Sequence, residues 1–122
     1  MSVDHGNLGF STVMGAATIA TLAVLLMAVL LFGTAVAARH RAQSVADLSA
    51  LAGASAALLE GRSGCEVARE LAADQEGALR VSACIQDGDD VQVTVSMTVR
   101  LGRFGIRDAT ASARAGPIES VE

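Results

Sequence analysis

The chain has few aromatic residues and little positive charge. Its 122 residues include three Phe, no Trp and no Tyr, and 13 acidic residues outnumber nine basic ones, which gives a formal net charge of −4. Proteins that bind nucleic acid usually carry a basic stripe, often with aromatic side chains that stack on bases. The composition therefore argues against a nucleic-acid partner.

Histidine and cysteine are also scarce. The two histidines, His5 and His40, flank a long apolar run, so neither accompanies a Ser or Cys of the distal part as a catalytic base. Two thiols are too few for a structural zinc site, and GRSGCE at 61–66 lacks the Lys and the spacing of a phosphate-binding loop. The acidic segment at 87–90 is typical of a solvated turn. The sequence thus predicts no enzyme, no metal, no cofactor and no small-molecule substrate.

The largest feature is an apolar run. From Thr12 to Ala38, 27 residues carry no charge. As an α-helix this run is about 40 Å long, against about 30 Å for the hydrocarbon core of a bilayer. Eleven of its residues are Val, Ile, Leu or Phe, which together favour insertion by about 5 kcal/mol. We expect a single transmembrane helix over residues 10–38.

A removable signal peptide is the alternative for this run. Signal peptides have a basic start, an apolar region of about 7 to 15 residues and an Ala-x-Ala exit. Residues 1–9 contain no Lys or Arg and the run is longer, although Ala35-Val36-Ala37 imitates an exit. A retained span is the favoured interpretation, and the signal-peptide alternative stays open.

The helix is expected to continue beyond the span, over residues 39–60. This segment has no Pro and is rich in Ala and Leu, and its apolar residues recur at spacings of three and four. These residues are Val45, Leu48, Leu51, Ala52, Ser55, Leu58 and Leu59. Since Asp47 is the only charge between Arg41 and Glu60, the face must be covered by protein. Gly61 is the predicted stop.

Residues 61–117 are expected to form a small α/β headpiece, followed by a tail at 118–122. Ser63 and Glu66 have the spacing of a capping box, which predicts a short helix over 64–75. Alternating apolar residues predict a hairpin around a four-residue DGDD loop. The apolar face has Leu79, Val81, Ala83 and Ile85 on the first strand, and Val91, Val93, Val95, Met97, Val99 and Leu101 on the second. A weaker third strand spans 109–115 and ends at Pro117. The fold class is α+β, with a long helix, a short helix and an antiparallel sheet of about three strands.

Cys65 and Cys84 allow three interpretations: a disulfide, a reactive pair, or two buried thiols. A disulfide closes a loop of about 20 residues and contributes about 3 kcal/mol in the chain-entropy model. Strict alternation puts Cys84 on the face opposite Val81 and Ile85, so a bridge requires the short helix at a sheet edge or a bulge in the strand. We favour the bridge, which indicates an oxidising compartment outside the cytoplasm.

The basic residues after the run indicate the opposite topology. Arg39-His40-Arg41 follows the span, whereas the first ten residues carry no Lys or Arg, so the positive-inside rule alone places the headpiece in the cytoplasm. Basic clusters also pair with lipid phosphates at either surface. The cysteines favour an extracytoplasmic headpiece, and the conflict stays open.

Several stretches, taken in order, resemble a known family. They are GFSTVMGAA at 9–17, ARHRAQSVADLSALAGASAAL at 38–58, the interval from Cys65 to Cys84, DGDDVQVTVSM at 87–97 and RAGP at 114–117. Together they are similar to the TadE-like (TadE/TadG-type) minor pilins and pseudopilins of tight-adherence (Flp) pilus and secretion systems, in particular a short actinobacterial subgroup. The resemblance implies a pilin-like fold, a single-pass protein of the cytoplasmic membrane or pilus, and other pilin-like subunits and assembly or secretion proteins as partners.

The resemblance also implies processing by a prepilin peptidase. The leader is then residues 1–9, with the cut between Gly9 and Phe10, and Gly6–Asn7 is the second choice. Such proteins commonly carry Glu at the fifth mature position, where this chain has Met14. That departure favours a minor or accessory subunit over the main pilus subunit. The alternative function is a single-pass, membrane-anchored extracytoplasmic binding module that does not assemble into pili.

Overall fold

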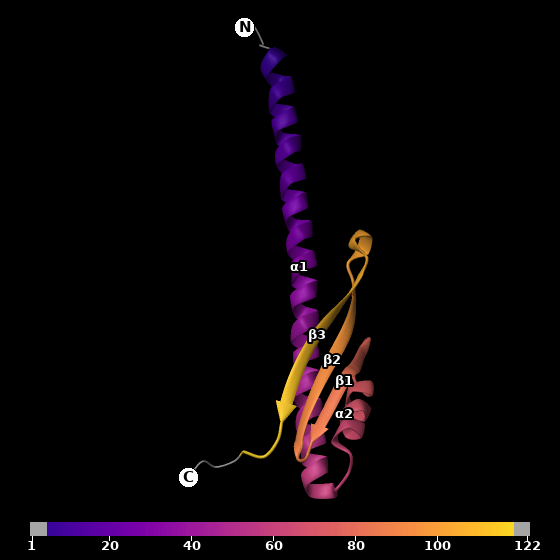
Figure 1. The fold of residues 1–122 in the computed structure, drawn as a ribbon. Helices are drawn as coiled ribbons and strands as arrows, with labels where there is room; N and C mark the ends of the chain where they lie inside the picture. The colour runs from indigo at the N-terminus through magenta and orange to yellow at the C-terminus, as the bar shows by residue number, and fades with distance from the viewer. Residues whose placement is uncertain (1–4, 119–122) are drawn as a thin grey trace. The chain divides into compact units, whose positions relative to one another are not determined.

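The computed structural model describes residues 5–118, with side chains from Gly9 onward. The elements are α1 (His5–Glu60), α2 (Gly64–Ala73), β1 (Leu79–Asp87), β2 (Asp90–Arg100), the 3₁₀ turn η1 (Gly102–Phe104) and β3 (Ile106–Ala115) (Figure 1). This is the expected α+β, pilin-like set of elements. Residues 1–4 of the expected leader and 119–122 of the expected tail lie outside the described residues. The chain divides into two units, one up to Gly33 and one from Thr34 onward, and each is described by itself.

The first unit is the apolar part of α1. None of its side chains from Gly9 to Gly33 is buried. Thr18 and Thr21 donate their hydroxyls to the carbonyl oxygens of Met14 and Ala17, at 2.8 and 2.9 Å. The polar side-chain groups of these two threonines are therefore satisfied within the helix, as a lipid environment requires.

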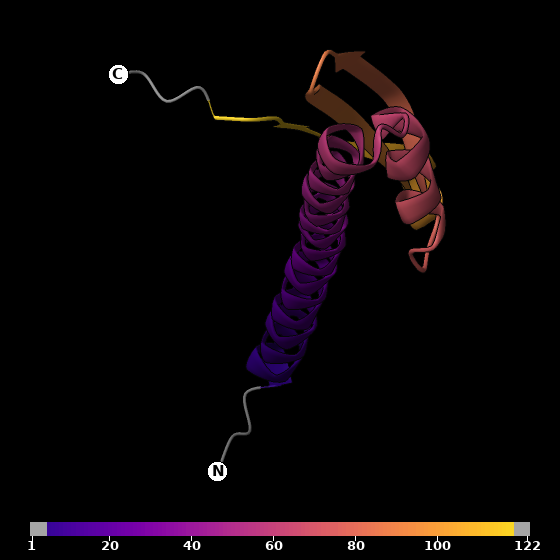
Figure 2. The ribbon, with the colours of Figure 1, turned by 90° about the horizontal axis from the view of Figure 1, so that it is seen from below.

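The second unit has two layers. It is called the headpiece from here on and includes the part of α1 from Thr34 onward. Its sheet is antiparallel with the order β1-β2-β3, and one face packs against α2 and the part of α1 from Thr34 onward. Figure 2 shows α2 beside the end of α1. The core joins small side chains of the helices to large ones of the sheet; its buried members are Ala42, Val45, Ala46, Ala50, Ala54, Ala68, Ala72, Leu79, Val91, Val93, Val95 and Ala111. Val91, Val93 and Val95 of β2 are completely buried, so the middle strand supplies most of the side-chain volume of the core.

The face that α1 buries differs from the predicted one. Leu48, Leu51 and Leu58 are about half exposed, and Leu59 is 86% exposed, so these leucines do not pack on the sheet of this chain, whereas Val45 is buried. The buried side carries Ala38, Ala42, Ala46, Ser49, Ala50, Gly53 and Ala54. Because the β2 valines already fill the space, only small residues let the helix backbone approach the sheet closely.

The predicted pattern of β1 is correct only in its first half. Val81 pairs with Val95 and Ala83 with Thr94, so Ser82 is an extra residue in a β-bulge. Beyond the bulge the alternation is shifted by one residue, so the side chains expected to face the core face solvent instead. Ile85 is therefore 63% exposed, and Cys84 packs against the core. The prediction that Ala83 and Ile85 face the core is wrong for this reason.

The turn between β1 and β2 is shorter than predicted. Asp87 pairs with Asp90, so the loop has two residues, not four. Gly88 adopts φ +60° at the first central position, as in a type II′ turn, whose twist suits a hairpin. Three further predictions are confirmed: Gly61 follows the end of α1, Ser63 caps α2, and the third strand is present and longer than expected. α2 ends at Ala73, two residues before its predicted end.

Candidate functional site

The exposed apolar part of α1 is the first candidate surface. α1 is the one helix among the described residues that is long and apolar enough to cross a membrane, a property that signal sequences share. Its large side chains, such as Phe10, Leu26 and Phe32, are 62–74% exposed. Added Cβ atoms at Gly15 and Gly33 would meet nothing within 4 Å. Among the described residues, therefore, none packs closely on Gly15 or Gly33, and most of the apolar surface stays exposed.

The expected processing site lies at the start of this helix. Gly6, Asn7, Gly9 and Phe10 all fall within the first two turns of α1. The first N–H groups of a helix have no partner inside it, and each glycine weakens a helix by about 1 kcal/mol relative to alanine. The bond between Gly9 and Phe10 therefore lies in a part of the helix that opens at low cost. Cleavage there, or at Gly6, stays a prediction.

The fifth position counted from Phe10 is exposed. Met14 occupies it and is 53% exposed. No carboxylate lies on α1 before Asp47 among the described residues. The described part of the helix around Met14 therefore carries no negative charge.

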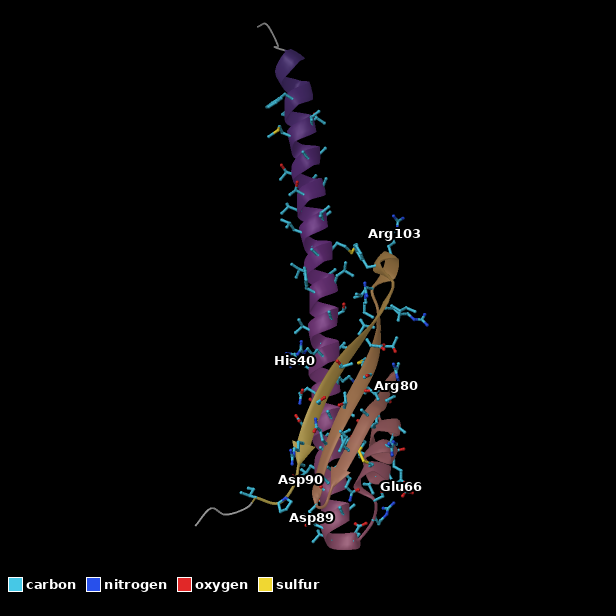
Figure 3. All side chains as sticks on the ribbon, viewed as in Figure 1. His40, Glu66, Arg80, Asp89, Asp90 and Arg103 are labelled. Carbon is cyan, nitrogen blue, oxygen red and sulfur yellow. A yellow bond between two sulfur atoms is a disulfide. The ribbon has the colours of Figure 1, made fainter. Side chains whose placement is uncertain are left out.

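The second candidate feature is the disulfide between Cys65 and Cys84. It joins the first turn of α2 to β1, with a Cα–Cα distance of 5.8 Å, inside the usual range for such bridges. Figure 3 shows the bond between α2 and the sheet. The sequence pattern required an edge position or a bulge, and the structure has both, since β1 is an edge strand and the bulge at Ser82 turns Cys84 toward α2.

A hydrogen bond supports the same junction. The N–H of Gly64 donates to Oε1 of Gln86 at 2.9 Å, so the bulge also aims this glutamine at the start of α2. An added Cβ on Gly53 would lie 2.6 Å from the Gly64 carbonyl oxygen, and one on Gly64 would lie 2.6 Å from a Val91 methyl. α1, α2 and β2 thus meet where two glycines are required. The sequence analysis missed Gly53, whose only signal is its place in a run of small residues.

The outer face of the sheet is polar. Arg80 donates to Asp108 at 2.9 Å and to the Thr98 hydroxyl at 3.1 Å (Figure 3 labels Arg80). Near the β1–β2 turn, Arg114 pairs with Asp90. The hydrogen bond to Asp90, reinforced by its negative charge, raises the pKa of Arg114 above its ordinary value. These pairs order the solvent face and supply neither a nucleophile nor a base.

The acidic turn has no metal-binding geometry. Among the described residues, no three His, Cys, Asp or Glu side chains are grouped so that they could hold a metal ion. Asp89 and Asp90 lie at the turn (Figure 3), and Asp90 is engaged with Arg114. The main features of the described residues are thus an apolar helix, a crosslink and a polar sheet face.

Comparison with protein-family models agrees with this picture. Residues 9–56 match a family described as putative Flp pilus-assembly TadE/G-like. The comparisons with curated proteins and with solved structures find no match. The matched range covers α1 from Gly9 through Ala56 and includes neither α2 nor the sheet. The N-terminal helix of this chain is thus similar to the TadE/G-like family of Flp pilus assembly.

Proposed function

We propose that the protein is a TadE-like minor pilin or pseudopilin of the short actinobacterial kind, a membrane-anchored structural component of an Flp pilus or related secretion apparatus. The observation that carries the proposal is the apolar helix over Gly9–Gly33, which buries no side chain within the chain and falls inside the match to the pilus-assembly family. Surface of this kind needs lipid or sibling helices around it.

The exposed leucines of α1 support assembly with other subunits. Leu48, Leu51 and Leu58 lie on the side of the helix opposite Ala42 and Gly53, which pack against the sheet and α2. One side of this helical segment therefore holds the headpiece together and the other stays free. We assign the free side to pilin-like siblings or assembly proteins.

Cleavage by a prepilin peptidase between Gly9 and Phe10 is part of the proposal. The disulfide supports an extracytoplasmic headpiece, because structural disulfides persist in oxidising compartments. The leader is then cut on the cytoplasmic side, and the span stays in the mature protein.

Mass spectrometry of the N-terminus, in cells with and without the prepilin peptidase, tests the proposal. We expect a mature chain that begins at Phe10 only when the peptidase is present. Gly9→Leu should block the cut, whereas the matched change Gly6→Leu should leave it in place. An uncut leader in both strains would overturn the pilin assignment, and a mature chain that begins after Ala38 would show a removed signal peptide.

The alternative, a membrane-anchored binding module that never assembles, is favoured by one observation. Met14 stands where assembling pilins commonly carry Glu. Such a module keeps residues 1–9 attached to the span, so the same mass measurement separates the two functions.

A further inference from the structure

The headpiece has one strongly basic end. Arg39 and Arg41 on α1, with Arg100, Arg103 and Arg107 on the hairpin tip, are five of the nine basic residues of the chain. We define the hairpin tip as residues 100–107, the connection from β2 to β3. The tip is closed by backbone hydrogen bonds. The N–H of Leu101 donates to the Gly105 oxygen at 2.9 Å, and the N–H groups of Phe104 and Gly105 donate to the oxygens of Leu101 and Gly102 at 3.1 and 3.3 Å. Arg103 stands at this end of the headpiece (Figure 3).

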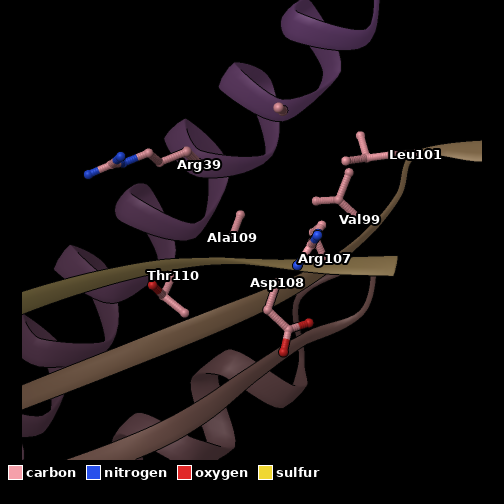
Figure 4. A pocket seen from close by; sticks show the side chains of 8 residues that line it. Arg39, Val99, Leu101, Arg107, Asp108, Ala109 and Thr110 are labelled. Carbon is pink, nitrogen blue, oxygen red and sulfur yellow. The ribbon is translucent and has the colours of Figure 1, made fainter. Parts of the chain in front are cut away.

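Two cavities are lined both by α1 and by residues at or near the tip. Arg39 and Arg107 line a cavity of about 310 Å³ together with Val99 and Leu101, and Figure 4 shows them with Arg39 on the helix and Arg107 on the sheet. Arg41 and Arg100 line a second cavity, of about 340 Å³. Arginines separated by some sixty residues in sequence therefore line the same two cavities, together with apolar side chains.

Most of this positive charge has no partner. Arg41 donates to the carbonyl oxygen of Glu76 at 2.7 Å. The other four arginines form no ion pair with any residue among those described. The acid nearest the tip in sequence, Asp108, is bound to Arg80. This end of the headpiece is consequently ready to accept an anion.

An exposed aromatic side chain lies among these arginines. Phe104 is the one aromatic residue of the chain beyond the apolar run, and it is 71% exposed, with Ile106 beside it at 64%. In a small domain an aromatic side chain is normally buried in the core. Aromatic and aliphatic side chains flanked by arginines are typical of segments that enter the membrane interface.

The base of the tip lies beside the last residues of the expected span. Ala35 and Arg39 line the same cavity as Leu101, and Arg39 directly follows the charge-free run. That run exceeds the hydrocarbon thickness by about 10 Å, so its last residues reach into the headgroup layer. Residues at the level of Ala35 are therefore within reach of lipid phosphates.

We propose that the hairpin tip and Arg39 form a second membrane contact, which inserts Phe104 into the interface and binds the phosphates of anionic phospholipids. The proposal rests on the retained span of the proposed function. Its consequence is that the headpiece lies against the bilayer with its acidic β1–β2 turn directed away. Each arginine near an anionic surface changes the docked population about fivefold.

A single tryptophan reports the contact, because the chain has none of its own. Phe104→Trp is placed in the full-length chain and reconstituted into vesicles of phosphatidylcholine, with or without phosphatidylglycerol. We expect a blue-shifted emission, protected from iodide and quenched by brominated lipid, that is strongest with phosphatidylglycerol. Ile85→Trp, on the outer face near the acidic turn, is the matched control and should stay accessible to iodide in both vesicles.

Charge variants complete the test. In the Phe104→Trp background, Arg103→Gln/Arg107→Gln should lower the ratio of docked to undocked tips about 25-fold, whereas the matched change Arg62→Gln/Arg69→Gln should not alter it. Emission that is identical in both vesicles overturns the inference, as does a shift that depends on protein concentration, which indicates a protein partner. Failure of the chain to float with vesicles at all would instead count against the retained span.

Discussion

Removal of the Cys65–Cys84 bridge is the most direct perturbation of the headpiece. The cysteines are 19 positions apart, so the loop has about 20 residues, and its closure contributes about 3 kcal/mol at 25 °C in the chain-entropy model. A unit of about 90 residues has a total stability of about 5–13 kcal/mol. The double variant Cys65→Ala/Cys84→Ala therefore loses between about a quarter and about 60% of that stability.

The expected loss is large enough to measure by calorimetry. Each kcal/mol shifts the melting temperature of a domain of this size by about 4–8 °C, so the double variant should melt about 12–24 °C below the wild type in the same detergent. A reductant should produce a similar shift in the wild type and none in the variant, since the chain has no other cysteines. A variant that melts within about 4 °C of the wild type would refute the calculation.

Three further predictions concern α1, each checked by thermal melting of the full chain. Gly53→Ala should destabilise the headpiece by about 1–3 kcal/mol, because its Cβ would lie 2.6 Å from a backbone oxygen. The control Gly33→Ala, whose Cβ would meet no atom within 4 Å, should not destabilise it, and equal effects of the two changes would exclude steric crowding. Ser49→Ala should stabilise by about 1 kcal/mol, because the buried Ser49 hydroxyl has no partner among the described residues; a loss would reveal a hidden partner. Leu51→Ser should change stability by less than about 0.5 kcal/mol; a larger loss would place this leucine in the core.

Local signals in the sequence predicted most of the elements of the headpiece. The capping residue Ser63, the stop at Gly61 and the alternation of Val91, Val93 and Val95 all act within a few residues of where they occur, and the structure has the corresponding helices and strands. The disulfide was also predicted, on the condition that the short helix lies at a sheet edge or that the strand has a bulge. Each of these features is decided by short-range chemistry.

Two features depended on packing between distant segments, and the sequence pattern misplaced both. The leucine spacing on α1 marks a good apolar face, but only the opposite face, with Gly53, fits against the β2 valines and Gly64. The bulge at Ser82 carries no residue signal of its own, because it is required by the position of α2 and the crosslink to Cys84. Neither outcome follows from the local order of apolar residues.

The arrangement of charge bears on the conflict between the two topology signals. The positive-inside rule takes the arginines after the span as a cytoplasmic marker, whereas the disulfide requires an oxidising compartment. A rule based on sequence counts only Arg39 and Arg41, but the fold brings Arg100, Arg103 and Arg107 to the same end of the headpiece. If lipid phosphates neutralise all five, this charge serves a surface contact that works on the outer leaflet as well as on the inner one. The basic cluster then no longer opposes an extracytoplasmic headpiece, which the crosslink favours.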